Sequence, residues 1–316
     1  MGRNCNQETE FLFTGLIDRQ VSQIPLFLLF LAIYLITMVA NIGLIFLIRV
    51  DSRLHTPMYF FLHYLAFVDL CYSTVIAPKM LADFLTERKN ISYIGCGVQV
   101  FLFGVFVVTE GFLLATMAYD RYVAISSPLL YSVIMSPKLR VWLVIGSFLI
   151  GCVNGMTQTV NLLYLSFCGS KVIDHFFCDI SPLISLSESD STINQIILLA
   201  SATLFGLSSG VIVLISYIFI LSTILRIHST EGKHKAFNTC TSHLTAVCIL
   251  YGTALFVYLK PSSKDSKPED KWAPVFYTVV TPMLNPLIYS LRNKEVKDAL
   301  KRIHTSTYLY IDLSEY

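Results

Sequence analysis

The chain has 316 residues, of which 54% are hydrophobic and only 14% are charged. Soluble domains carry about 25% charged residues, so this composition excludes an ordinary soluble domain and indicates a membrane protein. The net charge of +2 gives no support for a nucleic-acid partner. No Walker loop and no H-E-x-x-H motif is present, so nothing in the sequence predicts an enzyme.

Apolar runs long enough to cross a membrane recur along the chain, since a helical span needs about 20 residues. The seven runs are Pro25–Ile48, Met58–Met80, Gly97–Arg121, Leu139–Leu163, Ile196–Leu225, Ala236–Leu259 and Lys271–Leu291. None shows the alternation of a membrane strand. The sequence therefore predicts an all-α membrane protein, a seven-transmembrane helix bundle over residues 25–291 behind a polar tail over residues 1–24.

The distribution of charge favours one orientation. Lys and Arg concentrate in cytoplasmic loops. If the N-terminus is outside, the inner segments hold more basic residues than the outer ones, and the acidic residues lean outward. The first ten residues have no apolar core, so we expect the first apolar run to act as the insertion signal.

Two carboxylates interrupt the apolar runs, Asp69 in the second and Glu110 in the third. Acids within a membrane usually face the bundle interior and mark a functional site. If they face each other, they could share one proton, because two like charges close together are unfavourable, or they could bind a cation such as sodium. A protonated, hydrogen-bonded structural pair is the alternative. No other cofactor and no metal site is predicted.

An acid and a base stand side by side in M-A-Y-D-R-Y-V-A-I, at Asp120 and Arg121, where the third run meets a polar segment. Neighbouring residues on a helix do not face each other. Arg121 could therefore turn inward to another helix while Asp120 points toward a polar loop, forming a two-state latch. A solvated helix end is the alternative interpretation.

This segment, Met117–Ile125, resembles the signature of odorant receptors, a branch of the rhodopsin-like G-protein-coupled receptors. Three further motifs are similar to the family's and stand in its order: P-M-Y-F-F-L at Pro57–Leu62, K-A-F-N-T-C-T-S-H-L at Lys235–Leu244 and P-M-L-N-P-L-I-Y-S-L-R-N at Pro282–Asn293. The resemblance runs from about residue 11 to residue 303. It implies a multi-pass receptor of the plasma membrane, with the N-terminus outside, in the cilia of olfactory sensory neurons.

The resemblance implies that Asp69 and Glu110 approach each other across the second and third helices. It also implies an activation switch in the inner half of the bundle. Tyr217 and His243 would face Arg121 and help to hold or release it, although a packing role is the alternative for a membrane histidine. Pro286 would kink the seventh helix, because proline removes a backbone hydrogen bond. The implied switch residues are Asp120, Arg121, Tyr217, His243, Asn285, Pro286 and Tyr289.

The cysteines divide between the membrane and the outer loops. By resemblance Cys178 bonds Cys96 and staples the long loop after the fourth helix over the pocket mouth. A second family disulfide would use Cys168, but Glu188 stands where its partner is expected, so Cys168 is either free or paired with Cys5. The four remaining cysteines, in or at the apolar runs, are interpreted as packing residues: Cys71, Cys152, Cys240 and Cys248.

The polar segments carry two further signals. The family's N-terminal glycosylation sequon is absent, and the one sequon present is Asn90-Ile91-Ser92, which makes Asn90 a candidate glycosylation site. After the seventh run, Val296, Leu300 and Ile303 share one helical face opposite a basic face. This pattern predicts a short amphipathic eighth helix on the inner membrane surface, within the tail over residues 292–316.

The outer halves of the third, fifth, sixth and seventh helices are expected to enclose a ligand cavity. Its lining, placed by helical steps from the family motifs, is Phe103, Gly104, Val107, Val108, Ser201, Phe205, Tyr251, Ala254, Leu255, Tyr258 and Thr278. These residues are mostly apolar or aromatic, which favours a small, neutral, fairly hydrophobic molecule such as a volatile odorant.

The resemblance implies that the ligand activates a heterotrimeric G protein of the stimulatory, olfactory type and raises cyclic AMP, with membrane lipid as the other partner. Two alternatives stay open. The chain could be a rhodopsin-like receptor for a non-odorant small molecule. It could also be a seven-span transporter, although no internal repeat supports that reading.

Overall fold

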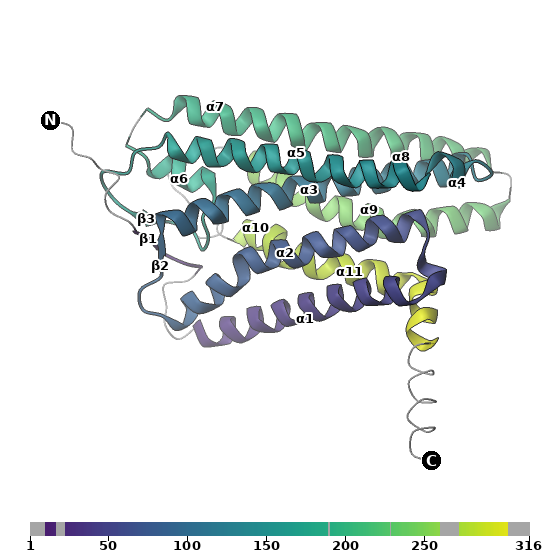
Figure 1. Ribbon diagram of the computed structural model, residues 1–316, viewed down its shortest axis with the longest axis horizontal. Coiled ribbons are helices and arrows are strands. Elements are labelled where there is room, and N and C mark those ends of the chain that lie inside the picture. Colours follow the sequence, from purple (N-terminus) through teal and green to yellow (C-terminus); the bar gives the residue numbers. More distant parts are fainter. Residues whose placement is uncertain (1–9, 17–22, 189, 228, 260–271, 303–316) are drawn as a thin grey trace, which may run out of the picture.

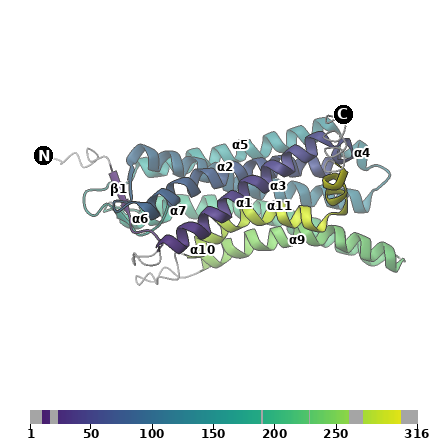
Figure 2. The same cartoon turned by 90° about the horizontal axis from the view of Figure 1, so that it is seen from below.

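The structure is a computed structural model that describes residues 10–16, 23–188, 190–227, 229–259 and 272–302. Within these ranges, seven helical rods run side by side along one axis (Figures 1 and 2). They are α1 (Gln23–Val50), α2 (Pro57–Leu85), α3 (Tyr93–Ser126), α5 (Pro137–Leu163), the continuous α7–η4–α8 (Thr192–Ser201, Ala202–Leu207, Ser208–Arg226), α9 (Thr230–Leu259) and the continuous α10–η6–α11 (Trp272–Val275, Phe276–Val280, Thr281–Arg292). The predicted seven-helix bundle is confirmed.

Length and composition agree with membrane spans. Among the described residues, five of these rods are long and apolar enough to cross a membrane, the continuous Thr192–Arg226 included, and α9 adds a shorter apolar stretch, Cys240–Leu255. In the most apolar part of α3, 61% of residues are buried inside the protein, against 28% for α1. Helix α3 is therefore the central rod, and the outer faces of the others present apolar side chains as a lipid-facing surface would.

Several helices extend beyond the predicted apolar runs. Helix α3 begins at Tyr93, where the Ser92 hydroxyl accepts a hydrogen bond from the backbone N–H of Gly95. Helix α5 begins at Pro137, with Ser136 accepting in the same way from Leu139. Such caps satisfy backbone donors that the first turn leaves unpaired. The apolar runs located the helices but missed their polar ends.

Two rods contain wide π-helical turns that the sequence did not predict, η4 in the fifth rod and η6 in the seventh. Insertions of this kind often occur at functional sites. Helix α11 also contains Pro286, and α2 contains Pro78. The seventh rod therefore departs from ideal helix geometry at two successive levels.

A small sheet at one end of the bundle was likewise not predicted. The strands β1 (Glu10–Phe13), β2 (Asn90–Ser92) and β3 (Val172–Ile173) lie in the order β2-β1-β3. Strand β1 pairs antiparallel with β2 and parallel with β3. Strands of two to four residues are too short to show a period in the sequence. The sheet joins the start of the chain to two loops at this end (Figure 1).

Short helices complete the connections: η3 (Ser52–Leu54), α4 (Tyr131–Ile134) and α6 (Ile180–Leu186). Residues 294–302 form the predicted eighth helix, at the end of the bundle opposite the sheet (Figure 1). Val296 and Ala299 are buried in the main core, whereas Leu300 is 53% exposed and Ile303 lies outside the described residues. The predicted apolar face is thus divided between protein contact and an exposed side chain.

Candidate functional site

A buried polar triad joins three rods at the middle of the bundle. The Asn285 side-chain amide donates hydrogen bonds to both carboxylate oxygens of Asp69, at 3.2 Å each, and to Glu110 Oε1 at 3.0 Å. All three side chains are at most 1% exposed. The predicted approach of Asp69 and Glu110 therefore occurs through an amide supplied by α11.

The triad leaves two oxygens without a hydrogen-bond partner, Glu110 Oε2 and Asn285 Oδ1. Two carboxylates this deep in a protein cannot both stay charged without compensation, because burial of a lone charge is costly. A proton on one acid, or a small hard cation that prefers oxygen ligands, fits the orphan oxygens. The described residues contain no cluster of three or more His, Cys, Asp and Glu side chains that could hold a metal ion.

The acid and base at the end of α3 point to different partners. Asp120, which is 1% exposed, accepts a hydrogen bond of 2.9 Å from the Tyr131 hydroxyl of α4. Arg121 is 6% exposed, and its Nε atom has no hydrogen-bond partner. The guanidinium lies within electrostatic range of Tyr217 and His243. This placement matches the geometry expected of a latch, in which Asp120 faces a loop and Arg121 faces the bundle.

His243 bridges α9 to its neighbours. The ring lies 2.7 Å from the Tyr217 hydroxyl through Nδ1 and 2.9 Å from the Leu114 carbonyl through Nε2. A carbonyl only accepts, so Nε2 carries the proton and Nδ1 accepts from the Tyr217 hydroxyl. Tyr217 and His243 thus contact each other directly and Arg121 only at longer range.

Tyr289, one turn beyond Pro286, is 4% exposed, and its hydroxyl has no hydrogen-bond partner. The buried Asn41 amide donates to the carbonyl of Pro282 at 3.0 Å and so ties α1 to α11 just before this segment. The stretch of α11 around Pro286 is therefore tied to α1 at its start, at Pro282, and ends at the Tyr289 hydroxyl, which makes no hydrogen bond.

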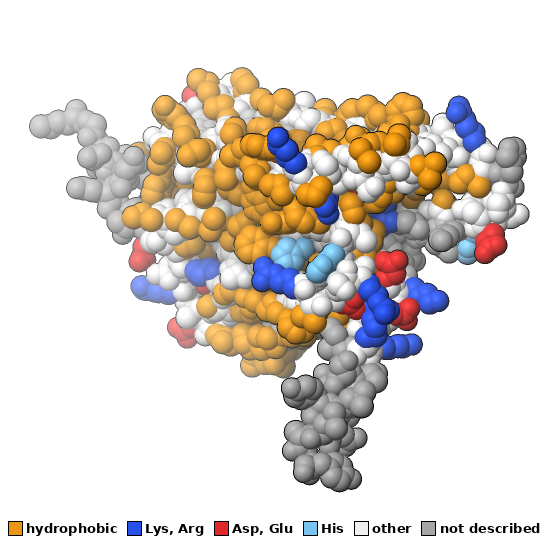
Figure 3. Space-filling model, turned by 45° about the vertical axis from the view of Figure 1, so that its right-hand side comes forward, with side chains coloured by type: hydrophobic (Ala, Val, Ile, Leu, Met, Phe, Trp, Pro, Cys, Tyr) orange, Lys and Arg blue, Asp and Glu red, His pale blue; other side chains and the backbone are white. Residues whose placement is uncertain are grey.

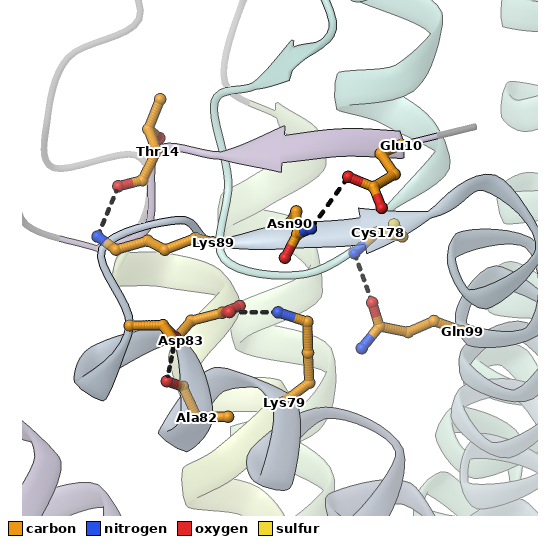
Figure 4. Close-up of polar contacts among 10 residues, drawn as sticks. Glu10, Thr14, Lys79, Ala82, Asp83, Lys89, Asn90, Gln99 and Cys178 are labelled. Carbon is orange, nitrogen blue, oxygen red and sulfur yellow. Dashed lines mark hydrogen bonds and ion pairs between the residues drawn. The ribbon is translucent and has the colours of Figure 1, made fainter. Parts of the chain in front are cut away.

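The loop that covers the sheet end is anchored at its centre. The predicted disulfide between Cys96 and Cys178 is present and ties the loop to α3. Gln99 reinforces it by accepting a hydrogen bond of 2.8 Å from the Cys178 backbone N–H (Figure 4) and by donating to the Val75 carbonyl at 3.0 Å. We name residues 172–186 the lid, since they carry β3, Cys178 and α6.

The remaining outer cysteine and the sequon also find partners. Cys168 is disulfide-bonded, so the free-thiol alternative is wrong, and Cys5, the suggested partner, lies outside the described residues. Asn90 is exposed on β2, and its amide donates to Glu10 at 3.0 Å (Figure 4). The interpreted packing cysteines, Cys71, Cys152, Cys240 and Cys248, are free.

Strand β1, which pairs with β3 of the lid, is also held by charged neighbours. Lys89 donates to the Thr14 carbonyl at 3.2 Å, and Lys79 pairs with Asp83 (Figure 4). The Lys79 ammonium also lies 5.6 Å from the centroid of the Phe13 ring. These contacts bind the start of the chain to α2 and to the α2–α3 connection.

One lid carboxyl has an altered acidity. Asp179 stands just before α6, and burial raises its pKa to about 6 although the backbone N–H groups of Ile180 and Ser181 lower it. In the same loop, the hydroxyl and backbone N–H of Thr192 lower the pKa of the exposed Asp190. The two carboxyls therefore titrate in different pH ranges.

Aromatic rings meet directly beneath the lid. The Phe103 ring lies 5.2 Å from Phe177 of the lid, 5.7 Å from Tyr72 and 6.2 Å from Tyr277, between ring centroids. Val107 packs against the same cluster. The sequence placed Phe103 and Val107 in the ligand cavity but missed the three partners, whose only signal was their position in apolar or loop segments.

Other expected cavity residues lie deeper or only partly buried. The Tyr251 hydroxyl donates to Ser209 at 2.8 Å, which links α9 to α8. Thr278 is fully buried and donates to the Pro274 carbonyl of its own helix. Ser201 is 7% exposed. Val108, Phe205 and Ala254 are partly buried.

Two expected cavity residues lie elsewhere. A side chain at Gly104 would meet Gly155 at 3.1 Å, because this glycine packs against α5 and accepts a hydrogen bond there from Asn154. Leu255 is 53% exposed on the outside of α9. The Tyr258 side chain lies outside the described residues. Gly104 and Leu255 were misplaced because helical steps counted from a motif do not register local twist or contact with α5.

Comparison with known proteins agrees with the fold. A family model described as olfactory receptor matches residues 30–307. The chain is 54% identical to "Olfactory receptor 5G25" of Mus musculus, with 98% of each chain covered, and 56% identical to "Olfactory receptor-like protein COR4" of Gallus gallus, with 95% of this chain and 96% of the other covered. The crystal structure of squid rhodopsin is similar with a TM-score of 0.70 at 18% identity, covering 92% of this chain and 87% of that one. At that identity the likeness concerns the fold alone.

Proposed function

Since the chain belongs to the olfactory receptor family of rhodopsin-like membrane receptors, we propose that it binds a small, mostly hydrophobic odorant and activates a G protein of the stimulatory, olfactory type, raising cyclic AMP. Its place of action is the plasma membrane of olfactory sensory cilia, with the N-terminus outside. The observation that carries the proposal is that two sites lie toward opposite ends of one helix bundle. An aromatic cluster lies under a disulfide-anchored lid, and a buried arginine lies near the other end.

The chemistry beneath the lid supports an apolar ligand. Phe103, Phe177 and Tyr277 supply rings, and Val107 adds an aliphatic wall. Apolar sites with few polar groups select small hydrophobic molecules and orient them by one hydrogen bond or none. We expect Phe103 to touch the ligand directly.

Activation proceeds as a population shift. A ligand can move the equilibrium only by the difference in its affinity for two arrangements. In the proposed mechanism, the ligand favours an arrangement in which the inner end of α9 moves outward, the Tyr217–His243 contact rearranges and Arg121 is released. The cleft that opens beside α3 then receives the G protein.

A cyclic AMP reporter in cells expressing the chain, challenged with a chemically broad panel of volatile compounds, tests the proposal. We expect at least one compound to raise cyclic AMP in a dose-dependent way. The Arg121→Ala variant should reach the cell surface and lose this response. The matched control is Arg53→Ala, which removes an exposed arginine at the same end of the bundle and should keep it. A normal response from Arg121→Ala would refute the latch, and substrate flux in vesicles without G-protein activation would favour the transporter alternative.

The ligand contact is tested separately with the first active compound. Phe103→Leu removes the ring but keeps an apolar side chain, so the dose-response midpoint should move by about tenfold if about 1.4 kcal/mol of ring contact is lost. Phe46→Leu is the control, because Phe46 is 57% exposed on α1, far from the lid. An unchanged midpoint in Phe103→Leu would place the ligand elsewhere.

A further inference from the structure

A hollow lies at the opposite end of the bundle from the lid. It has a volume of about 460 Å³ and opens between the end of α1, η3, the start of α2 and the start of α5. Its polar lining consists mainly of Arg49, His55, His63 and Arg140, and its apolar wall includes Phe60 and Tyr64. None of these residues belongs to the expected ligand-contacting residues or to the switch described above.

The lining of the hollow is cationic and contains no acid. Arg140 stacks its guanidinium 5.4 Å from the centroid of the Phe60 ring, and its buried Nε atom has no hydrogen-bond partner. Arg49 is exposed at the rim. A guanidinium held on an aromatic face with a free donor is arranged to bind a phosphate or carboxylate oxygen.

Two acids near the segments around the hollow, Asp51 and Asp120, are already engaged. Asp51 accepts two hydrogen bonds from the guanidinium of Arg302, and Asp120 accepts one from Tyr131, although Asp120 also lies within electrostatic range of Arg140. Neither carboxylate supplies Arg140 with a hydrogen bond among the described residues. The positive charge of the hollow is therefore left for an external anion.

The apolar surface beside the hollow continues toward the middle of the bundle. Phe46, Phe67 and Ile145 are 57%, 45% and 40% exposed and lie one to two turns along α1, α2 and α5 from the basic lining. Figure 3 shows histidine and basic side chains together on this face, bordered by hydrophobic side chains. A molecule with an anionic head and long apolar tails fits both the basic hollow and the apolar surface beside it. A soluble anion would contact only the basic hollow.

We propose that this hollow binds the phosphate of an anionic phospholipid headgroup, with Arg140 and Arg49 holding the phosphate and the acyl chains lying along Phe46, Phe67 and Ile145. The two histidines line the same space and act as further donors. The inference requires only that the bundle spans a membrane. It is independent of odorant binding, so it can fail while the proposed function stands, or the reverse. In the proposed orientation the hollow faces the cytoplasmic leaflet, where anionic lipids concentrate.

The test uses the purified full chain in nanodiscs that contain phosphatidylcholine with increasing phosphatidylserine, and native mass spectrometry counts retained lipid. Wild-type protein should retain phosphatidylserine in preference to phosphatidylcholine. Each basic residue near a membrane surface contributes about 1 kcal/mol, so Arg49→Gln and Arg140→Gln should each weaken retention about fivefold. Lys138→Gln, which removes an exposed charge two residues from Arg140 and outside the hollow, is the matched control and should match wild type.

Two outcomes overturn the proposal. Equal loss of phosphatidylserine in Lys138→Gln and in the two arginine variants would show diffuse surface attraction instead of a site. Displacement of phosphatidylserine by millimolar glycerol phosphate, with equal affinity for the two, would show a site for soluble phosphate that ignores the acyl chains. Arg49 is exposed, so Arg49→Gln folds even if the partly buried Arg140 does not tolerate replacement, and the test stays decisive.

Discussion

A single amide organises the charged centre of this protein. Asn285 donates to Asp69 and Glu110 from a helix that carries no acid there, so the two carboxylates depend on α11 for their neutral neighbour. The sequence located both acids and the asparagine separately. The resemblance implied that the two acids approach each other, but it did not place Asn285 between them, because that contact depends on how α2, α3 and α11 are rotated about their axes.

Removing that amide tests the arrangement. In Asn285→Ala both acids lose a donor, and a buried acceptor left unpaired costs about 1–3 kcal/mol. We expect the purified receptor in detergent to unfold at a clearly lower temperature. The double variant with Glu110→Gln should lose less than the sum of the single changes, because the glutamine removes one charge and brings its own N–H donors. Strict additivity would mean that the amide and Glu110 do not interact.

Residues of the switch show the same division between what sequence can and cannot supply. The motif around Arg121 left two interpretations open, an inward arginine with an outward aspartate or a solvated helix end, and in the structure Asp120 bonds Tyr131 of a loop helix while Arg121 is buried. Tyr131 itself was not foreseen, since a tyrosine in a polar loop gives no signal. Tyr131 is positioned by α4, a helix of four residues, which is too short to show a periodic pattern in the sequence.

At the scale of elements, the eighth helix is held by a pair of contacts. Arg302 bonds Asp51 at 2.6 Å and 3.0 Å, and Tyr59 donates to Glu295 at 2.7 Å. The Arg302 guanidinium keeps the pKa of Asp51 below its usual value. The ion pair between Asp51 and Arg302 therefore stabilises the folded state above the unfolded pKa of Asp51, about 4. This stabilisation is lost as the pH falls through the lowered pKa of the folded state.

The matching prediction concerns hydrogen exchange in residues 294–302. Replacing Asp51 by Asn should speed exchange in this helix at pH 7, because the charged partner of Arg302 is gone. Wild-type protection should stay constant from pH 8 to pH 5 and decline below about pH 4. Arg53→Gln removes a neighbouring exposed charge and should leave exchange unchanged. Faster exchange in Arg53→Gln to the same degree would mean that loop charge in general holds the helix.

The lid has its own pH dependence. Because burial raises the pKa of Asp179 to about 6, the native lid disfavours the charged carboxylate. The sign is opposite to that of Asp51: the lid is most stable below the unfolded pKa of about 4, loses stability as the pH rises toward 6, and is constant above that.

Exchange rates in residues 172–186, corrected for the intrinsic effect of pH, should therefore rise between pH 4 and pH 6 and then level off. The Asp179→Asn variant should abolish this trend. Asp190→Asn is the control in the same loop, since the pKa of Asp190 is lowered and its titration lies below this window. A trend that persists in Asp179→Asn would assign it to another group.

The helices and strands differed in how well the sequence predicted them. Long apolar rods were found because the membrane imposes their length. The sheet of β1, β2 and β3 was not, since its strands come from three separate segments of two to four residues and form only when the loops meet. The π-helical turns η4 and η6 were missed for a related reason: one additional residue per turn leaves no mark on an apolar run.

For the molecule as a whole, the order of three sites along the axis of the bundle determines how a signal could pass through it. The lid and its aromatic cluster lie at the sheet end, and the triad of Asp69, Glu110 and Asn285 lies between. Arg121 and the hollow lined by Arg49 and Arg140 lie toward the other end. A change near the lid can reach Arg121 only through the rods, and α3 carries residues of all three levels. The resemblance to odorant receptors implied this arrangement, with a ligand cavity in the outer half of the bundle and a switch in the inner half.

The last prediction concerns this axis directly. Strand β1 and the helix over residues 294–302 lie at opposite ends of the bundle (Figure 1). In a membrane these ends face opposite sides, since the rods between them run along the same direction. An epitope tag before residue 1 should therefore bind antibody on intact cells, and a tag after residue 316 should bind only after the cells are made permeable. Antibody binding to both tags on intact cells would contradict the seven-span arrangement, and labelling of the C-terminal tag alone would reverse the proposed orientation. In that reversed case the lid and its aromatic cluster would face the cytoplasm and could not meet an odorant arriving from outside.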